Sequence, residues 1–238
     1  MGTNQEILEQ IEEYLAESYT RSDTNIVPKR DDLTFGNTVK KMVHAKAFYI
    51  DMRKSRKILS DASTFWSIKI HKAFLGAVTY CIERREGHLR SFNGDGLLAF
   101  FIGENAGSRA IRTAMDIKGF VLKINEILNN NDIENIDFGI GIAQSEVLVA
   151  KSGKAGDDQT RQDLIWVGIS VYVAVELSEF GKSSKNIWIS NNVLNSVMSE
   201  KDVLNVLKYD GNWIWFYEYK TLNNGYQKVY HTTWYFNV

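Results

Sequence analysis

The sequence has few residues suited to covalent or metal cross-links. Cys81 is the only cysteine among 238 residues, so a disulfide framework is excluded. The four histidines, His44, His71, His88 and His231, are scattered without the ligand spacing of a zinc site. Hydrophobic residues make up 44% of the chain, enough to fill a core in a domain of this length. We therefore expect a fold that is stabilised by core packing.

The sequence also lacks an excess of one charge and any long apolar run. Lysine and arginine number 28 against 29 aspartate and glutamate residues, which does not favour non-specific binding to nucleic acid or to a membrane surface. No apolar stretch approaches the ~20 residues of a membrane-spanning helix, and the acidic N-terminus is unlike a signal peptide. These absences predict a cytoplasmic protein that binds neither nucleic acid nor a membrane.

The patterning predicts a β-α-β-β-α-β order of elements, and hence an α+β fold. Apolar runs indicate buried strands, apolar residues at helical spacing indicate two long helices, and Asn93-Gly94 is a strong signal for a hairpin between them. The expected elements span residues 46–52, 65–84, 88–92, 97–102, 106–129 and 136–143.

Both ends of the chain extend beyond this core. Residues 4–19 are expected to form a short amphipathic helix, and residues 22–37 read as a linker. This divides the chain into an N-terminal helix and linker at 1–38 and one larger domain at 39–238.

The C-terminal region is rich in aromatic residues. Aromatic segments at 213–220 and 227–234 flank Asn223-Asn224-Gly225, which is typical of a hairpin turn. Cross-strand packing explains the aromatic residues, and a subunit contact or a base-stacking role is the alternative.

Two aspartates stand where strands normally avoid them. Asp51 lies at the end of the first apolar strand and Asp95 in the hairpin turn. Carboxylate oxygens suit Mg²⁺ or Mn²⁺, and two such ions about 3.5–4 Å apart can activate an attacking oxygen and neutralise phosphates. If the fold brings the aspartates together, they predict phosphoryl chemistry on a nucleoside triphosphate. Taken singly, Asp51 is equally compatible with a helix cap and Asp95 with a turn residue.

A basic run follows Asp51 directly and leads towards the first long helix. Arg53, Lys54 and Ser55 open this run, and free N–H groups at a helix start attract phosphate. We expect these residues to bind the triphosphate, with a solvated basic turn as the alternative. The segment 151–156 does not fit the P-loop pattern and is interpreted as a mobile loop at the rim of a site.

Four motifs, in order, resemble those of the class III nucleotidyl cyclases, the adenylate and guanylate cyclase superfamily. They are Tyr49-Ile50-Asp51, the hairpin Asn93 to Phe100, the strand Phe138 to Ala143, and Gly168-Ile169-Ser170-Val171-Tyr172-Val173-Ala174. The resemblance covers roughly residues 45–197 and implies a ferredoxin-like or palm core, with the catalytic domain at 39–238.

The resemblance implies a reaction and a set of ligands. The ribose 3′-hydroxyl attacks the α-phosphorus, pyrophosphate leaves, and a 3′,5′-cyclic monophosphate forms. Asp51, Asp95 and the backbone carbonyl of Met52 would hold two Mn²⁺ or Mg²⁺ ions. Family members are dimers with active sites between two chains, so one subunit would supply the aspartates, and the other would supply Ile165 and the last helix.

Departures from the family pattern point to a pyrimidine base. Ser91 and Ile165 occupy the two positions that read the base in purine cyclases, and neither matches an adenine or guanine reader. Tyr49 faces the same side of its strand as Asp51 and would narrow the pocket. The chain is therefore most similar to the pyrimidine cyclases of bacterial antiphage defence (Pycsar type), whose product activates a separate effector. UTP is favoured over CTP, and a purine cyclase is the alternative.

Two other departures concern the rate of the reaction. The asparagine and arginine usual on the last helix fall on Tyr172 and Glu176, so the cation that stabilises the transition state is missing there. The candidates to replace it are Arg161, Lys151, Lys154 and Arg90. Without a replacement, the chain would be a catalytically silent nucleotide-binding module.

Overall fold

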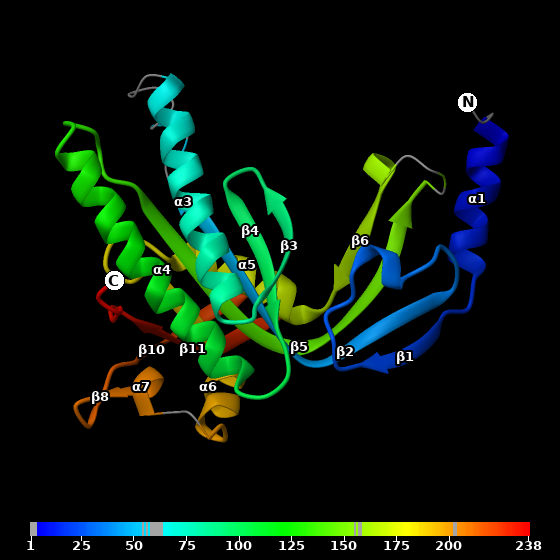
Figure 1. Ribbon diagram of the computed structural model, residues 1–238. Helices are drawn as coiled ribbons and strands as arrows, with labels where there is room; N and C mark the ends of the chain where they lie inside the picture. Colours follow the sequence, from blue (N-terminus) through cyan, green and yellow to red (C-terminus); the bar gives the residue numbers. More distant parts are fainter. Residues whose placement is uncertain are drawn as a thin grey trace.

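The computed structural model describes residues 4–53, 55, 57, 64–154, 156, 159–201 and 204–238 (Figure 1). The elements are α1 (Asn4–Ala16), β1 (Thr20–Thr24), β2 (Thr38–Arg53), α3 (Thr64–Arg84), β3 (His88–Asn93), β4 (Gly96–Phe101), α4 (Ala106–Asn129), β5 (Asp137–Gly153), β6 (Gln162–Val167), α5 (Ile169–Phe180), β7 (Ile187–Ser190), α6 (Asn191–Met198), α7 (Leu204–Leu207), β8 (Lys208–Tyr209), β9 (Asn212–Trp213), β10 (Phe216–Leu222) and β11 (Gly225–Thr232).

One sheet organises the described chain, with the order β10-β11-β7-β5-β2-β4-β3. Its long central strands β2 and β5 are antiparallel, as are the pairs β2–β4 and β3–β4. The elements β2-α3-β3-β4-α4-β5 therefore form the β-α-β-β-α-β core that the sequence predicts, and the α+β expectation is confirmed.

Helices cover the two faces of the sheet unequally. Phe48 and Ile50 of β2 point into the larger core, which is closed by α3 and α4. Ala47, the residue before Phe48, points to the opposite face, where it packs in the same cluster as Ala174 and Leu177 of α5. This alternation is the period of two expected for a strand that is buried on both faces. Figure 1 shows α3 and α4 together on one side of the sheet.

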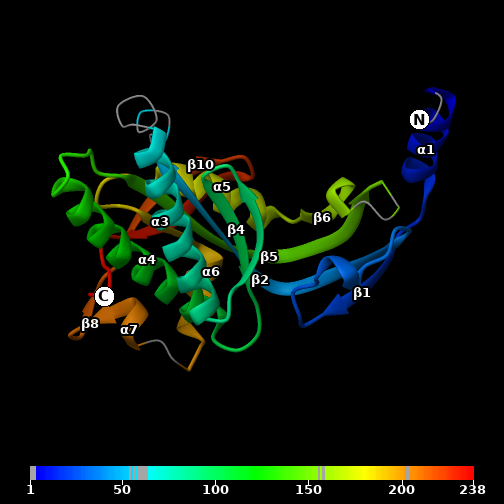
Figure 2. The same cartoon turned by 45° about the horizontal axis from the view of Figure 1, so that its top comes forward.

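The N-terminal end of β2 and the C-terminal end of β5 pair to form an arm that extends away from this body (Figures 1 and 2). A register shift between Met42 and Ala45 marks the base of the arm, where His44 adopts a positive φ of 56°. Along the arm, β1 pairs with β2 and β6 pairs with β5. Helix α1 lies at its outer end and has no buried residue.

Two expectations from the sequence are wrong in this arm. The segment read as a linker contains most of β1, which pairs in parallel with β2 from Thr20 opposite Thr38 to Thr24 opposite Met42. The segment read as a loop begins as strand, because β5 continues to Gly153 and pairs with β6. Strand β1 is short and polar, so its pairing is decided by the neighbouring strand and has little local signal. The division of the chain at residue 38 stays a prediction.

The C-terminal hairpin is confirmed and extends the sheet. Strand β10 pairs with β11 around the expected turn, and β11 pairs with β7. Trp213 lies outside the hairpin, in β9, which pairs with β8. None of the described helices is long and apolar enough to cross a lipid bilayer.

Two glycines of β5 set the distance between α5 and the sheet. A Cβ atom on Gly141 would clash with the Ala174 carbonyl oxygen and lie 2.7 Å from the Ser178 nitrogen. A Cβ on Gly139 would clash with the Ser178 carbonyl oxygen. The glycine spacing of the motif at 138–143 is therefore a helix-packing requirement.

Gly141→Ala is expected to lower the free energy of unfolding by about 1–3 kcal/mol, because the backbone of α5 must move away from the sheet. Urea denaturation measures the change. Gly76→Ala is the matched control, since Gly76 lies in α3 with no atom within 4 Å of the added Cβ, and it should stabilise by roughly 0.5–1 kcal/mol. Equal stabilities for the Gly141→Ala variant and the wild type would contradict the packing argument.

Candidate active site

The end of β2 and the β3–β4 turn bring the two expected aspartates into one place. Asp51 pairs across the sheet with Gly96, the residue that follows Asp95. A Cβ on Gly96 would lie 3.1 Å from Oδ1 of Asp51 and 2.5 Å from the Tyr49 hydroxyl oxygen. Glycine at this position therefore leaves space for the Asp51 and Tyr49 side chains beside the turn.

The electrostatics of Asp51 show that these carboxylates interact. Burial raises the pKa of Asp51 most, the negative charge of Asp95 raises it further, and Arg53 acts in the opposite direction. A partly buried carboxylate that lies near a second negative charge is a place that a bound cation would stabilise.

Tyr49 and Ser91 lie on the same face as Asp51. In register, Tyr49 is opposite Leu98 of β4, and Leu98 is opposite Ser91 of β3, so the three form one row across the sheet. With strands about 4.8 Å apart, Tyr49 and Ser91 are about 10 Å from each other along this row. Burial and, next, the charge of Asp51 raise the pKa of the Tyr49 hydroxyl, which keeps it neutral and able to donate a hydrogen bond.

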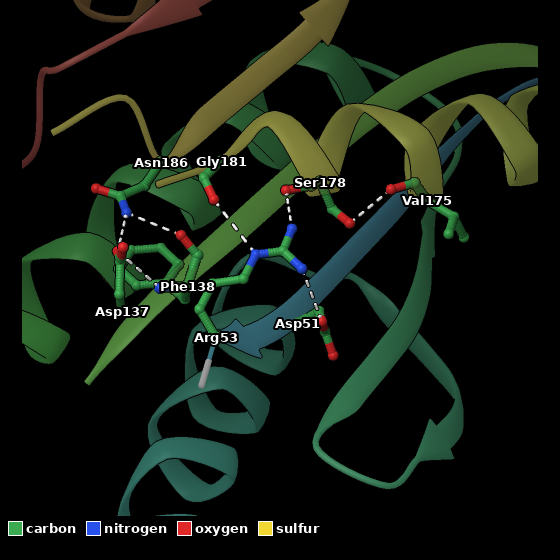
Figure 3. Close-up of polar contacts among 8 residues, drawn as sticks. All are labelled: Asp51, Arg53, Asp137, Phe138, Val175, Ser178, Gly181 and Asn186. Carbon is green, nitrogen blue, oxygen red and sulfur yellow. Dashed lines mark hydrogen bonds and ion pairs between the residues drawn. The ribbon is translucent and has the colours of Figure 1, made fainter. Parts of the chain in front are cut away.

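Arg53 connects Asp51 to the C-terminal end of α5 (Figure 3). Its Nη1 lies 3.0 Å from Oδ2 of Asp51, its Nε donates to the Gly181 carbonyl oxygen at 3.3 Å, and its Nη2 donates to the Ser178 carbonyl oxygen. The Ser178 carbonyl also accepts from the Gly181 amide at 2.8 Å, so the guanidinium adds a second bond at the end of the helix while it fixes one oxygen of Asp51.

A second polar group holds the segment that follows α5. Asn186 Nδ2 donates to Oδ1 of Asp137 at 2.9 Å and to the Phe138 carbonyl oxygen at 2.8 Å. The other carboxylate oxygen of Asp137 accepts from the Ser183 amide at 2.8 Å. The start of β5 thus fixes the loop between α5 and β7, and with it the carbonyl groups that Arg53 contacts.

The donors at this place suit a hard divalent cation. Among the described residues, no group of three or more histidine, cysteine, aspartate or glutamate side chains converges, so Asp51 and Asp95 are the acidic donors that the fold offers here. The Met52 side chain is buried in the core, and the role of its carbonyl oxygen as a ligand stays a prediction.

The expected triphosphate residues are only partly described. Arg53 is engaged with Asp51 and α5, Ser55 is half-buried in a helical conformation, and Lys54 lies outside the described residues. Their role in triphosphate binding stays a prediction.

The remaining expected residues on the arm lie far from Asp51 within one chain. Asp51 is opposite Gly139 of β5, whereas Ile165 is opposite Ala150, eleven positions further along the strand and thus about 36 Å away at 3.3 Å per residue. Ile165 is 47% exposed. The candidate cations Lys151, Lys154 and Arg161 belong to the same end of the arm.

Two other candidate residues have structural partners. Arg90 donates to the Val27 carbonyl oxygen at 3.0 Å and lies over the Trp166 ring, so it holds the N-terminal segment against the arm. Glu176 accepts hydrogen bonds from the backbone and side-chain nitrogens of Asn223 in the β10–β11 turn. Tyr172 is exposed on the first half of α5.

One acidic residue near the site was missed from the sequence. The charge of Glu179 contributes to the raised pKa of Asp51. Tyr172, Glu176 and Glu179 are spaced four and three residues apart and therefore share one face of α5, which is the signal that would have identified Glu179.

Known proteins resemble this chain in sequence and in overall fold. No protein-family model matches the chain. A uridylate cyclase of Xanthomonas perforans is 25% identical over 98% of both chains, and a uridylate cyclase of Burkholderia cepacia is 24% identical over 88% of this chain and 98% of its own. The crystal structure of the guanylyl cyclase Cya2 superposes with a TM-score of 0.66 at 15% identity, covering 83% of this chain and 94% of Cya2. The resemblance and the fold expected from the sequence are confirmed.

Arg53→Lys is expected to destabilise the protein by about 1–3 kcal/mol without any nucleotide, because an ammonium group cannot serve Asp51 and two separate carbonyl groups at once. Chemical denaturation of the free protein measures this loss. Lys57→Gln is the control, since it removes an exposed ion pair with Glu134 that contributes at most about 1 kcal/mol. A wild-type stability for Arg53→Lys would mean that the guanidinium contacts do not fix α5.

Proposed function

We propose that this protein, which has the fold of the class III nucleotidyl cyclases, converts a pyrimidine nucleoside triphosphate to the 3′,5′-cyclic monophosphate and pyrophosphate, with UTP favoured over CTP. The observation that carries the proposal is the placement of Asp51 beside the turn that bears Asp95, where the charge of Asp95 raises the pKa of Asp51 further after the effect of burial. Relatives named uridylate cyclase that match nearly the whole chain support the base preference.

The carboxylate pair fits Mn²⁺ or Mg²⁺, and two ions bound by Asp51, Asp95 and the Met52 carbonyl would lower the pKa of the ribose 3′-hydroxyl and neutralise the triphosphate. In the reaction, a bond forms between the 3′-oxygen and the α-phosphorus, and the bond from that phosphorus to pyrophosphate breaks. Arg53 holds one oxygen of Asp51, so Oδ1, on the side of Gly96, stays directed to the turn.

The residues beside the carboxylates favour a small base. Tyr49 occupies the face shared with Asp51, and its neutral hydroxyl can donate to a carbonyl oxygen of a pyrimidine. Ser91 lies in the same row and offers a short hydroxyl in place of the longer side chains that reach a purine edge. The triphosphate would extend towards Arg53, Lys54 and Ser55.

We further propose a two-fold homodimer in which each active site is shared. Ile165 and Tyr172 are exposed, and in one chain the arm holds Ile165 away from Asp51. Two equivalent sites would then each combine the aspartates of one subunit with the arm and α5 of the partner. In this arrangement Arg161, Lys151 or Lys154 of the arm would supply the cation for the transition state.

The proposed biological role is that of a cytoplasmic enzyme in antiphage defence, with its cyclic nucleotide activating a separate effector. Challenge of bacteria that carry the gene and its genomic neighbours with phage would test this role. Protection that persists in the Asp95→Asn variant would contradict it.

A catalytically silent nucleotide-binding module is the second candidate. Glu176 accepts a hydrogen bond from Asn223, and Tyr172 is exposed near the start of α5. Neither position therefore provides the ribose and phosphate contacts that are usual in the family. Such a module would bind a triphosphate and release no pyrophosphate.

Incubation with all four ribonucleoside triphosphates and Mn²⁺, followed by mass spectrometry, is expected to yield cyclic UMP as the main product. Asp95→Asn should reduce turnover at least about 10³-fold, because a charge-stabilising group at the reacting phosphate is lost. The same variant should melt at or above the wild-type temperature without metal, since it removes the repulsion at Asp51.

The control for this assay is Asp132→Asn, a change of an exposed carboxylate in the loop after α4. Its turnover should equal that of the wild type. A purine cyclic nucleotide as the main product would refute the base assignment, and binding without any pyrophosphate release would favour the silent module.

Mixing two inactive variants tests the shared site. Asp51→Asn and Ile165→Arg should each abolish activity, and after subunit exchange the mixture should recover about a quarter of wild-type activity, because half of the dimers then contain one intact site of two. Activity is measured on the mixture and on each variant alone. A mixture that stays inactive although light scattering shows mixed dimers would contradict a shared site.

A further inference from the structure

Lys46 is a buried lysine that has no partner among the described residues. It lies in β2, and only 5% of its surface is exposed. Among the described residues, no hydrogen bond or ion pair to Lys46 is formed, although a buried ammonium normally has one. Burial lowers the pKa of Lys46 most. The charge of Glu200 raises this pKa, and the charge of Arg109 lowers it.

Lys46 lines a polar cavity of about 610 Å³ on the face of the sheet that α4 and α6 cover. The walls come from the base of the arm, the connection between β4 and α4, and helix α6, which packs beside α4 (Figure 1). Besides Lys46 and the acidic Glu200, the side chains that provide hydrogen-bonding groups are His44, Gln144, Asn105, Asn192, Asn195, Ser196 and Ser199.

Gln144 lies beside Lys46 and lines the same cavity. It is opposite Lys46 in the β2–β5 register, so both side chains project to the same face. Its Oε1 atom is buried and has no hydrogen-bond partner. Lys46 therefore lies beside a neutral amide group, and among the described residues no carboxylate forms an ion pair with its ammonium group.

The acidic residue at the rim is already engaged. Glu200 accepts from the backbone nitrogens of Gly107 and Ser108, both at 2.8 Å, and so caps the first turn of α4. Its two carboxylate oxygens are directed to that helix, and the Lys46 charge is left for another partner. The cavity thus offers one cation, several amide and hydroxyl donors, and no carboxylate free to bind a metal.

We propose that this cavity binds the oxyanionic group, carboxylate or phosphate, of a small molecule, with Lys46 as its charged partner and the amides of α6 and of the β4–α4 connection as further donors. The donor set matches an anion that accepts several hydrogen bonds, one of them assisted by charge. The volume leaves room for the remainder of a molecule larger than the anion itself.

This site is separate from the candidate active site. Lys46 precedes Asp51 by five residues and points to the face covered by α4 and α6, whereas Asp51 and Tyr49 point to the face of α5. The proposal therefore does not rest on the cyclase function.

Thermal denaturation with inorganic phosphate, sulfate or acetate at 20 mM and constant ionic strength tests the site. At least one anion is expected to raise the melting temperature of the wild type by roughly 3 °C or more, as for a dissociation constant near 2 mM. Lys46→Met should lose this shift. In the absence of anion it should melt at or above the wild-type temperature, because it no longer buries an ammonium group without a partner.

Two variants complete the experiment. Lys201→Met removes a neighbouring lysine whose side chain is 90% exposed, and it should keep the anion shift. Gln144→Leu should also keep it at reduced or equal size, since the glutamine oxygen does not bind an anion directly. Equal shifts for the wild type and Lys46→Met with all three anions, or no shift in the wild type with any of them, would overturn the proposal.

Discussion

The close contact between α5 and the two glycines of β5 is the constraint on which the candidate active site depends. Gly139 and Gly141 let the backbone of the helix lie directly on the sheet, so the carbonyl groups of Ser178 and Gly181 reach the end of β2. Arg53 then joins those carbonyl groups to Asp51. A side chain on either glycine would displace the helix, and Asp51 would lose the contact that orients it.

The same site contains an unfavourable interaction between the charges of Asp51 and Asp95. Asp51 is partly buried next to the charge of Asp95, and a single guanidinium offsets part of this cost on one side only. Stability is thus lost at a place where a cation would restore it, which is usual for sites built around their ligands. Lys46 is a comparable case with the opposite sign, because its buried charge has no ion-pair partner among the described residues.

The sequence predicted the core well where the pattern was local. The helix at 106–129 was expected with its observed bounds, and the hairpin signal Asn93-Gly94 placed Asp95 correctly. It failed where the structure depends on a distant neighbour. Strand β1 has no hydrophobic alternation and forms because β2 lies beside it, and the basic candidate Arg90 proved to hold the Val27 segment. Such partners are far apart in sequence, so local patterns carry no information about them.

The sequence by itself determined the order of the elements, the chemical nature of Asp51, Tyr49 and Asp95, and the resemblance to the class III nucleotidyl cyclases, because these follow from side-chain periodicity, turn residues and short motifs. Only the tertiary structure decided that Arg53 is engaged by α5, that Ile165 lies on an arm away from Asp51, and that Lys46 is buried with no partner in the described part of the chain. The physical reason is that burial and contact are properties of packed strands and helices, and these are set by the whole fold and not by any one segment.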